Sequence, residues 1–317
     1  MAKILLTGGS SFSGLWIAEA LAGAGHELVA AVTRPTTGYD GLRAERMERL
    51  AKIAQVVYAA PVASPAFLEL AGAGHDVLAH HAADIPNYRS ASYDPVEGFV
   101  RNIAGVQAAL ETFAGAGGQA VIATGTVFEG GEGGAGDNLA VSPYGLSKSL
   151  TNEAVRHMAR WRGLRFGKFV VSGPFGPLEE GRMVWSLMQR WFEREAGVVR
   201  TPRYVRDNIP VTLLARAYAA LVEELLDSDS PAEKIARPSG VVGSQEAFAR
   251  LLATELGPRL GLACQLQILA QPELVEPLSR INDQSWLAPG WADDGFWDDY
   301  AAYYQRVAAS GLLSAPA

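Results

Sequence analysis

The sequence opens with MAKILLTGGSSFSG, residues Met1 to Gly14, and this stretch decides the fold. Residues 3–6 form a short apolar run typical of a fully buried strand, and apolar residues recur at helical spacing from Leu15 to Leu21. Between them lies the glycine-rich turn of residues 7–14. The backbone N–H groups of such a turn and the positive end of the helix dipole bind a pyrophosphate. We therefore predict a dinucleotide-binding unit, the alternative being an ordinary turn between a strand and a helix.

Composition narrows the class of protein. The chain has 317 residues, of which 49% are hydrophobic and 19% charged, enough for a large core and too little charge for disorder. Its net charge of −7 disfavours nucleic acid or an anionic membrane as partner, so an anionic ligand needs local arginines. The single cysteine, Cys264, fits a reducing compartment. With no signal peptide and no apolar run of the ~18 residues that a membrane span needs, we expect a cytoplasmic protein.

Strand and helix patterns then alternate along the chain. Strands are expected at 27–33, 55–58, 76–83, 120–123 and 166–171, and helices at 95–113, 144–162, 183–192 and around 296–304. The pattern predicts a doubly wound parallel sheet over residues 1–165, a Rossmann α/β fold. A smaller α+β substrate lobe is expected over 166–317, with some chain returning to the sheet. The glycine-rich residues 129–137 are expected to form a mobile flap.

The end of the second strand bears on the choice between NAD and NADP. An NAD site places an acidic residue about 20 residues beyond the glycine turn, where it binds the ribose 2′-hydroxyl. This chain has Thr33 and Arg34 instead. A hydroxyl and a guanidinium suit the 2′-phosphate of NADP better, so NADP is expected and NAD is the alternative.

Three further patterns concern chemistry. Tyr144 and Lys148 are four residues apart and share a helix face, where an ammonium would lower the tyrosine pKa toward neutrality. The adjacent pair His80-His81 does not indicate a metal site, because neighbouring strand residues point to opposite faces. The arginine-rich stretch 200–208 is either a solvated loop or, as we prefer, a phosphate-binding loop.

Together these residues resemble the extended short-chain dehydrogenase/reductase superfamily, in its NAD(P)-dependent nucleotide-sugar epimerase/dehydratase branch. The resemblance spans nearly the whole chain. Residues 7–14 are similar to the TGxxGxxG turn, with Ser11 in place of a glycine, and residues 80–83 (HHAA) to the HLAA strand end. Tyr144 and Lys148 match YxxxK.

The substrate motifs of that branch are matched only in part. Residues 204–211 resemble its RDxxxV segment, which makes Arg206 the arginine that binds the substrate diphosphate. Arg280, upstream of Gly290-Trp291, resembles a second phosphate-binding arginine. Gly173 stands where the NxYGP motif has its asparagine, so that substrate contact is in doubt.

The resemblance implies roles for named residues. Tyr144 would exchange a proton with a sugar hydroxyl or ketone, Thr124 would hydrogen-bond the same oxygen, and Lys148 would bind the nicotinamide ribose. The implied catalytic residues are Thr124, Tyr144, Lys148 and Asn102, the last at a position where the family has a structural or catalytic asparagine. Those implied for the cofactor are Thr7, Gly8, Ser10, Ser11, Phe12, Gly14, Thr33, Arg34, His81, Ala82, Ala83 and Lys148. Those implied for the substrate are Asp84, Thr126, Gly173, Arg206 and Arg280, and no metal is expected.

The segment after Thr124 selects among the reactions of this branch. Its 4,6-dehydratases carry Asp-Glu at that point, in TDEVY, and the related decarboxylases keep the glutamate. Here residues 124–128 read TGTVF, without either carboxylate. A nucleotide-sugar 4-ketoreductase or 4-epimerase, which needs only Tyr, Lys and Ser/Thr, is therefore expected. The alternatives are a reductase of non-nucleotide ketones or aldehydes and a catalytically silent dinucleotide-sensing regulator. The resemblance also implies a homodimer formed by the helices at 95–113 and 144–162.

Overall fold

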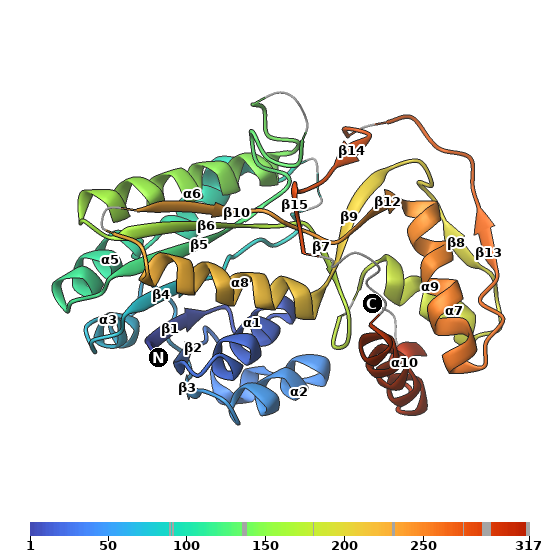
Figure 1. The fold of residues 1–317 in the computed structure, drawn as a ribbon, viewed down its shortest axis with the longest axis horizontal. Coiled ribbons are helices and arrows are strands. Elements are labelled where there is room, and N and C mark those ends of the chain that lie inside the picture. The colour runs from blue at the N-terminus through green and yellow to red at the C-terminus, as the bar shows by residue number, and fades with distance from the viewer. Residues whose placement is uncertain are drawn as a thin grey trace.

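The computed structural model describes residues 1–88, 90, 92–134, 138–179, 181–229, 232–274, 276–286 and 293–314. Its centre is a parallel sheet with the strand order β10-β6-β5-β4-β1-β2-β3 (Figure 1). These strands are β1 (Lys3–Thr7), β2 (Glu27–Ala31), β3 (Gln55–Val57), β4 (Val77–His80), β5 (Ala120–Thr126), β6 (Arg165–Val171) and β10 (Glu233–Ala236). Strands β1 to β6 have the order β6-β5-β4-β1-β2-β3, which is that of the doubly wound dinucleotide-binding fold. The predicted fold class is therefore confirmed.

Helices cover both faces of this sheet because its strands are apolar on both sides. One face carries α1 (Phe12–Gly23), α2 (Gly41–Leu50) and α8 (Val211–Leu226). The largely exposed 3-10 turn η1 (Thr36–Gly38) lies between β2 and α2 in the chain. The other carries α3 (Pro65–Ala71), α4 (Pro95–Ile103), α5 (Val106–Gly115) and α6 (Pro143–Trp161). Within β1, Ile4 and Leu6 lie in the first core and Leu5 in the second, as the alternation of strand side chains requires.

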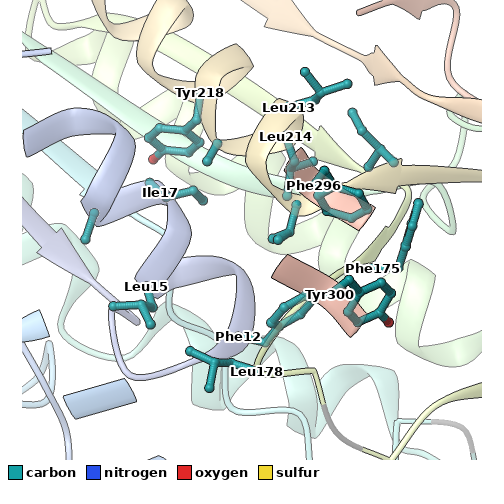
Figure 2. Packing of buried hydrophobic residues seen from close by; sticks show 14 of the residues in the cluster. Phe12, Leu15, Ile17, Phe175, Leu178, Leu213, Leu214, Tyr218, Phe296 and Tyr300 are labelled. Atoms are coloured by element: carbon teal, nitrogen blue, oxygen red, sulfur yellow. The ribbon is translucent and has the colours of Figure 1, made fainter. Parts of the chain in front are cut away.

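The first core continues into the C-terminal part of the chain. Ile17 of α1 lies near Tyr218 of α8, Phe12 of α1 lies near Leu178 and Tyr300, and Phe175 belongs to the same apolar cluster (Figure 2). The helix α10 (Asp294–Ala309) supplies Tyr300 and is docked through its aromatic side chains, as the sequence predicts.

The smaller lobe follows β6 and lies beyond the carboxyl end of the large sheet (Figure 1). Its main sheet contains β7 (Gly173–Phe175), β9 (Val205–Pro210), β12 (Val241–Ser244) and β14 (Ser279–Arg280). Its remaining elements are the pairs β8 (Gly197–Val199) with β13 (Leu266–Ile268) and β11 (Pro238–Ser239) with β15 (Gln284–Ser285), the helices α7 (Met183–Phe192) and α9 (Gln245–Leu260), and the turn η2 (Leu312–Ser314). The chain returns to the large sheet through α8 and β10, beyond the boundary at residue 165.

Three local predictions need correction. The helix expected over 95–113 is broken after Ile103, because Gly105 takes a positive φ of 76° and lies against Ala63, where a Cβ would not fit. The described part of the expected flap is anchored, since Glu129 and Glu132 are buried; residues 135–137 lie outside the described residues. The expected arginine-rich loop becomes strand β9 from Val205 onward.

Within the described part of the chain, every helix is too short or too polar to cross a membrane.

Candidate active site

The glycine turn has the geometry of an anion cradle. Gly8 has a φ of 78°, and a Cβ there would lie 2.8 Å from the backbone nitrogen of Ala82. Gly14 faces the Gly8 carbonyl so closely that a side chain would not fit. The Ser11 hydroxyl accepts a hydrogen bond from the Gly14 N–H at 3.0 Å and so caps α1. The Phe12 ring is buried in the core. The backbone N–H of Phe12 belongs to the first turn of α1, whose N–H groups have no partner within the helix, and it is suited to bind a pyrophosphate. The residues present fit a dinucleotide.

A buried arginine that sequence reasoning missed supports this turn. Arg46 donates from Nε to the Ser10 carbonyl at 3.0 Å and from Nη1 to the Leu178 carbonyl at 2.9 Å. It lies four residues from both Leu42 and Leu50, two apolar residues buried on the same helix. An arginine in the middle of an apolar helical face was therefore the available signal.

The end of β4 joins the turn to the catalytic region. Thr7 Oγ1 accepts a hydrogen bond from the Ala82 N–H at 3.0 Å and lies 3.2 Å from His80 Nδ1. Ala83 and Asp84 follow on an exposed loop. Burial lowers the pKa of His80 to about 4, so the imidazole is neutral. Among the described residues there is no cluster of three metal-ligating side chains, and the two histidines bind different threonines.

Thr124 is held by a chain of polar groups. His81 Nδ1 lies 2.9 Å from Thr124 Oγ1, and His81 Nε2 lies 3.0 Å from Ser13 Oγ at the start of α1. Burial, with a smaller effect of Lys148, lowers the pKa of His81 to about 4. One ring nitrogen of this neutral imidazole is a donor and the other an acceptor. His81 therefore links the cofactor cradle to the hydroxyl expected to bind the reacting oxygen.

The Asn102 side-chain amide forms hydrogen bonds with backbone groups of two segments. Its Oδ1 accepts from the Asp84 N–H at 2.7 Å, and its Nδ2 donates to the carbonyls of Asp84 and Gly98 at 2.9 and 2.7 Å. Both ends of the amide are thus used to fasten the loop after β4 to α4.

Helix α6 places the tyrosine and the lysine together. Ser142 caps its N-terminus by accepting from the Gly145 N–H at 3.1 Å. Gly145 packs directly on the Phe128 carbonyl, which brings the Tyr144 ring to 5.8 Å from the Phe128 ring. Lys148 lies one turn further along and is buried.

The electrostatics of Tyr144 differ from the sequence expectation. Burial raises the pKa of Tyr144 above its ordinary value, Glu129 adds to the rise, and a hydrogen bond with Thr126 opposes it. Burial also lowers the pKa of Lys148, although Glu129 opposes that shift. The expected lowering of the tyrosine pKa by Lys148 is therefore wrong for this structure, because desolvation dominates. Tyr144 stays protonated.

Sequence reasoning also missed a buried ionic cluster beside this pair. Lys168 Nζ lies 2.9 Å from Glu129 and 2.8 Å from Glu132, and Arg237 Nε lies 2.6 Å from Glu132. Glu129 Oε1 also accepts from the Thr126 N–H at 2.8 Å. These carboxylates lie in a glycine-rich segment without periodicity, so the sequence offered no signal for their burial.

The two predicted phosphate-binding arginines meet in the smaller lobe. Arg280 and Arg206 are paired in register on β14 and β9, and their Nη2 atoms lie 2.7 and 3.0 Å from the same Glu276 oxygen. The Arg280 guanidinium lies 3.7 Å from the centre of the Phe128 ring, which in turn contacts Tyr144. Arg280 is thus connected to Tyr144 through the Phe128 ring, and Arg206 is connected to Arg280 through Glu276. Gly290 and Trp291 lie outside the described residues.

A cavity of about 920 Å³ is lined by two tyrosines that pack on Tyr144, while Tyr144 is not itself one of the lining residues. The two tyrosines are Tyr88 and Tyr93, whose rings lie 5.2 and 6.3 Å from the Tyr144 ring, and Arg101 and Arg182 also line the cavity. A cavity of this size accommodates a small-molecule ligand.

A family model described as the NAD dependent epimerase/dehydratase family matches residues 4–233. The chain belongs to this family. It is accordingly an enzyme of the extended short-chain dehydrogenase/reductase type. Comparison of the sequence with curated proteins gives no significant match.

Solved structures similar to this family member share its fold at low sequence identity. The UDP-glucose 4-epimerase of Thermotoga maritima, with UDP-glucose, is 18% identical with a TM-score of 0.72, covering 96% of this chain and 99% of that one. The UDP-glucuronic acid 4-epimerase of Bacillus cereus, with UDP-glucuronic acid and NAD, is 19% identical with a TM-score of 0.73 and the same coverages. DesIV, a dTDP-glucose 4,6-dehydratase of Streptomyces venezuelae, is 16% identical with a TM-score of 0.72, covering 97% and 98%.

Three other predicted positions of this epimerase/dehydratase family member are Thr33, Arg34 and Gly173. Thr33 and Arg34 are exposed just beyond β2, and Arg34 Nη1 donates to the Gly38 carbonyl at 3.1 Å. Gly173 lies in β7, paired with Asn208 of β9.

Proposed function

We propose that this enzyme transfers a hydride between a nicotinamide dinucleotide and C4 of a nucleotide sugar, as a 4-ketoreductase or a 4-epimerase. The observation that carries the proposal is that Arg280, paired with Arg206 on the smaller lobe, lies over the Phe128 ring, which contacts the ring of Tyr144. Tyr144 is one helical turn from the buried Lys148. Tyr144 and Lys148 supply proton transfer, and the two arginines are suited to a diphosphate.

Each residue then has a defined task. The cradle of Gly8 to Gly14 would hold the dinucleotide, which when bound supplies the hydride. Tyr144 gives its proton to the C4 carbonyl oxygen as the alcohol forms, and its raised pKa keeps that proton in place beforehand. Thr124, oriented by His81, hydrogen-bonds the same oxygen. Lys148 binds the nicotinamide ribose.

Thr33 and Arg34 favour the ketoreductase over the epimerase, because they suit NADP. A reductase exchanges NADPH at each turnover, whereas an epimerase retains its cofactor, usually NAD, through both half-reactions. We also propose NADP as the cofactor, because residues 32–39 contain no carboxylate and Arg34 lies beyond β2.

One observation favours a second candidate. Glu276 already neutralises charge on both arginines, which suits a substrate without a diphosphate. A reductase of non-nucleotide ketones or aldehydes is therefore the alternative.

Thermal shift with UDP-, dTDP- and GDP-glucose, followed by turnover assays, tests the proposal. A nucleotide sugar should raise Tm, because a ligand bound by the native state stabilises it. Consumption of NADPH by the corresponding 4-keto sugar would identify a reductase, and interconversion of 4-epimers without net NADPH consumption an epimerase. If no nucleotide sugar binds while a simple ketone is reduced, the alternative replaces the proposal.

We further propose that the enzyme is a homodimer through α4 and α6. These helices expose apolar side chains on a shared surface, namely Val96, Val100, Leu146 and Leu150.

A further inference from the structure

We propose that Asn208 supplies the substrate-binding amide that residue 173 cannot carry. The inference rests on the proposed function and deepens it, by assigning Asn208 to an oxygen on the sugar-phosphate side of a nucleotide sugar. An asparagine amide both donates and accepts, so it suits a phosphate oxygen or a sugar hydroxyl.

The first observation is that position 173 has no room for a side chain. Gly173 on β7 lies beside Asn208 on β9, and a Cβ at Gly173 would lie 2.8 Å from the Asp207 carbonyl oxygen. That oxygen belongs to the backbone of β9, so moving it aside would disturb the pairing of the strand. An asparagine at residue 173, as in the NxYGP motif, is therefore sterically excluded.

The second observation is where the Asn208 amide lies. The same Cβ position is 3.4 Å from Asn208 Oδ1, so the amide of the neighbouring strand comes close to the place where a side chain at Gly173 would begin. The Asn208 Nδ2 atom is buried and has no hydrogen-bond partner among the described residues. Buried polar groups are normally paired, so this amide nitrogen is a donor available to a ligand.

The third observation is the face on which the residue lies. Alternate residues of a strand share a face, so Asn208 lies on the face of Arg206, and Asp207 on the other. Asp207 has a structural role there, since its carboxylate accepts from the N–H groups of Gly240 and Asn282 at 2.7 and 3.1 Å. Among the described residues, the Asn208 side chain has no such bonds.

The position along the strands defines what Asn208 would bind. Gly173, beside Asn208, follows closely on Val171, which pairs with Thr126 of β5. Thr126 in turn hydrogen-bonds with Tyr144. Asn208 therefore lies between the arginine expected to bind the diphosphate and the tyrosine expected to act at C4, which matches the sugar-phosphate part of the ligand.

Asn208→Ala tests the assignment, with KM and Tm measured on the same preparation. Loss of a hydrogen bond to a phosphate oxygen should raise the KM of the nucleotide sugar about tenfold to a hundredfold. We expect kcat and the Kd of NADPH to stay within about twofold, and Tm to stay level or rise, since no internal bond is lost. Asn208→Asp should raise KM further, because a carboxylate repels the phosphate.

Asn282→Ala is the matched control. The Asn282 Nδ2 donates to the carbonyls of Val170 and Pro238, both at 2.9 Å, so its removal should lower Tm. A fall in Tm on Asn208→Ala with unchanged KM would make Asn208 structural and overturn the inference.

Arg206→Met separates this inference from the proposed function. If Arg206→Met raises KM and Asn208→Ala leaves it unchanged, the inference fails and the proposed function stands. If UDP-, dTDP- and GDP-glucose all fail to bind the wild-type enzyme in calorimetry, both fail.

Discussion

Replacing each lobe arginine by methionine tests whether a diphosphate binds between them. Methionine keeps an apolar stem and removes the charge. The structure predicts unequal effects. Arg206 Nη1 is already bonded to the carbonyls of Val205 and Leu278 at 2.8 and 3.1 Å, so its Nη2, now on Glu276, is the part most easily turned to substrate. Arg280 Nε and Nη1 have no hydrogen-bond partners among the described residues.

The expected rise in KM for each variant follows from the number of guanidinium N–H donors that the arginine can offer to the substrate. One charge-assisted hydrogen bond contributes about 1.5–3 kcal/mol, or roughly tenfold to over a hundredfold in affinity. Arg206→Met should therefore raise the nucleotide-sugar KM about tenfold, and Arg280→Met about a hundredfold or more, with the Kd of NADPH unchanged. Burial lowers the pKa of Arg280 to about 10, so the side chain remains cationic at neutral pH.

Steady-state kinetics at saturating NADPH give the two KM values, and a thermal melt checks that the buried Arg280 variant is folded. The companion variant Glu276→Gln should lower KM, because it frees both guanidinium groups from a competing carboxylate. An unchanged KM in both arginine variants, with intact folding, would refute the diphosphate assignment.

Four further changes have expected outcomes. Tyr144→Phe should lower kcat about 10²–10⁴-fold in steady-state assays, with cofactor affinity nearly intact, because it removes the transferable proton. Arg34→Glu should move the Kd ratio of NADPH to NADH toward NADH by about tenfold, because a carboxylate repels the 2′-phosphate. Val100→Glu should yield a monomer by light scattering, since Val100 is 56% exposed on the proposed dimer surface. Burial raises the pKa of Glu179 from 4.5 to about 7, so the native state binds the proton more tightly than the unfolded chain. The stabilisation from that proton is complete below pH 4.5 and is lost as pH rises to about 7. In Glu179→Gln, the free energy of unfolding from denaturant titrations should lose up to about 3 kcal/mol of this pH dependence.

The fold was predictable because its signals are local. The apolar run before Gly8 and the helical spacing after Gly14 each depend on neighbouring residues, and alternation of such units permits few topologies. The break at Gly105 was harder to foresee, because apolar spacing continues through it. The cause is the contact with Ala63, distant in sequence.

The sequence identified candidate residues that the structure brings close together, but not their electrostatic arrangement. The spacing of Tyr144 and Lys148 correctly indicated a shared helix face, yet it contains nothing about desolvation. Glu129 and Glu276 lie in irregular segments, so no periodic sequence pattern predicts that they lie near the site. Their charges act through space, and each changes the interpretation of a residue that the sequence did identify.

These two carboxylates bear on both ends of the proposed substrate. Glu129 disfavours the phenolate of Tyr144, and so keeps a proton donor where a carbonyl oxygen would lie. Glu276 holds Arg206 and Arg280 side by side, so two like charges stay close until a stronger anion replaces the carboxylate. A diphosphate, with more charge and more acceptor oxygens than a single carboxylate, can replace it, whereas a neutral ketone cannot. The effect of Glu276→Gln therefore distinguishes the two proposed substrate classes: KM should fall for a nucleotide sugar and stay unchanged for a simple ketone.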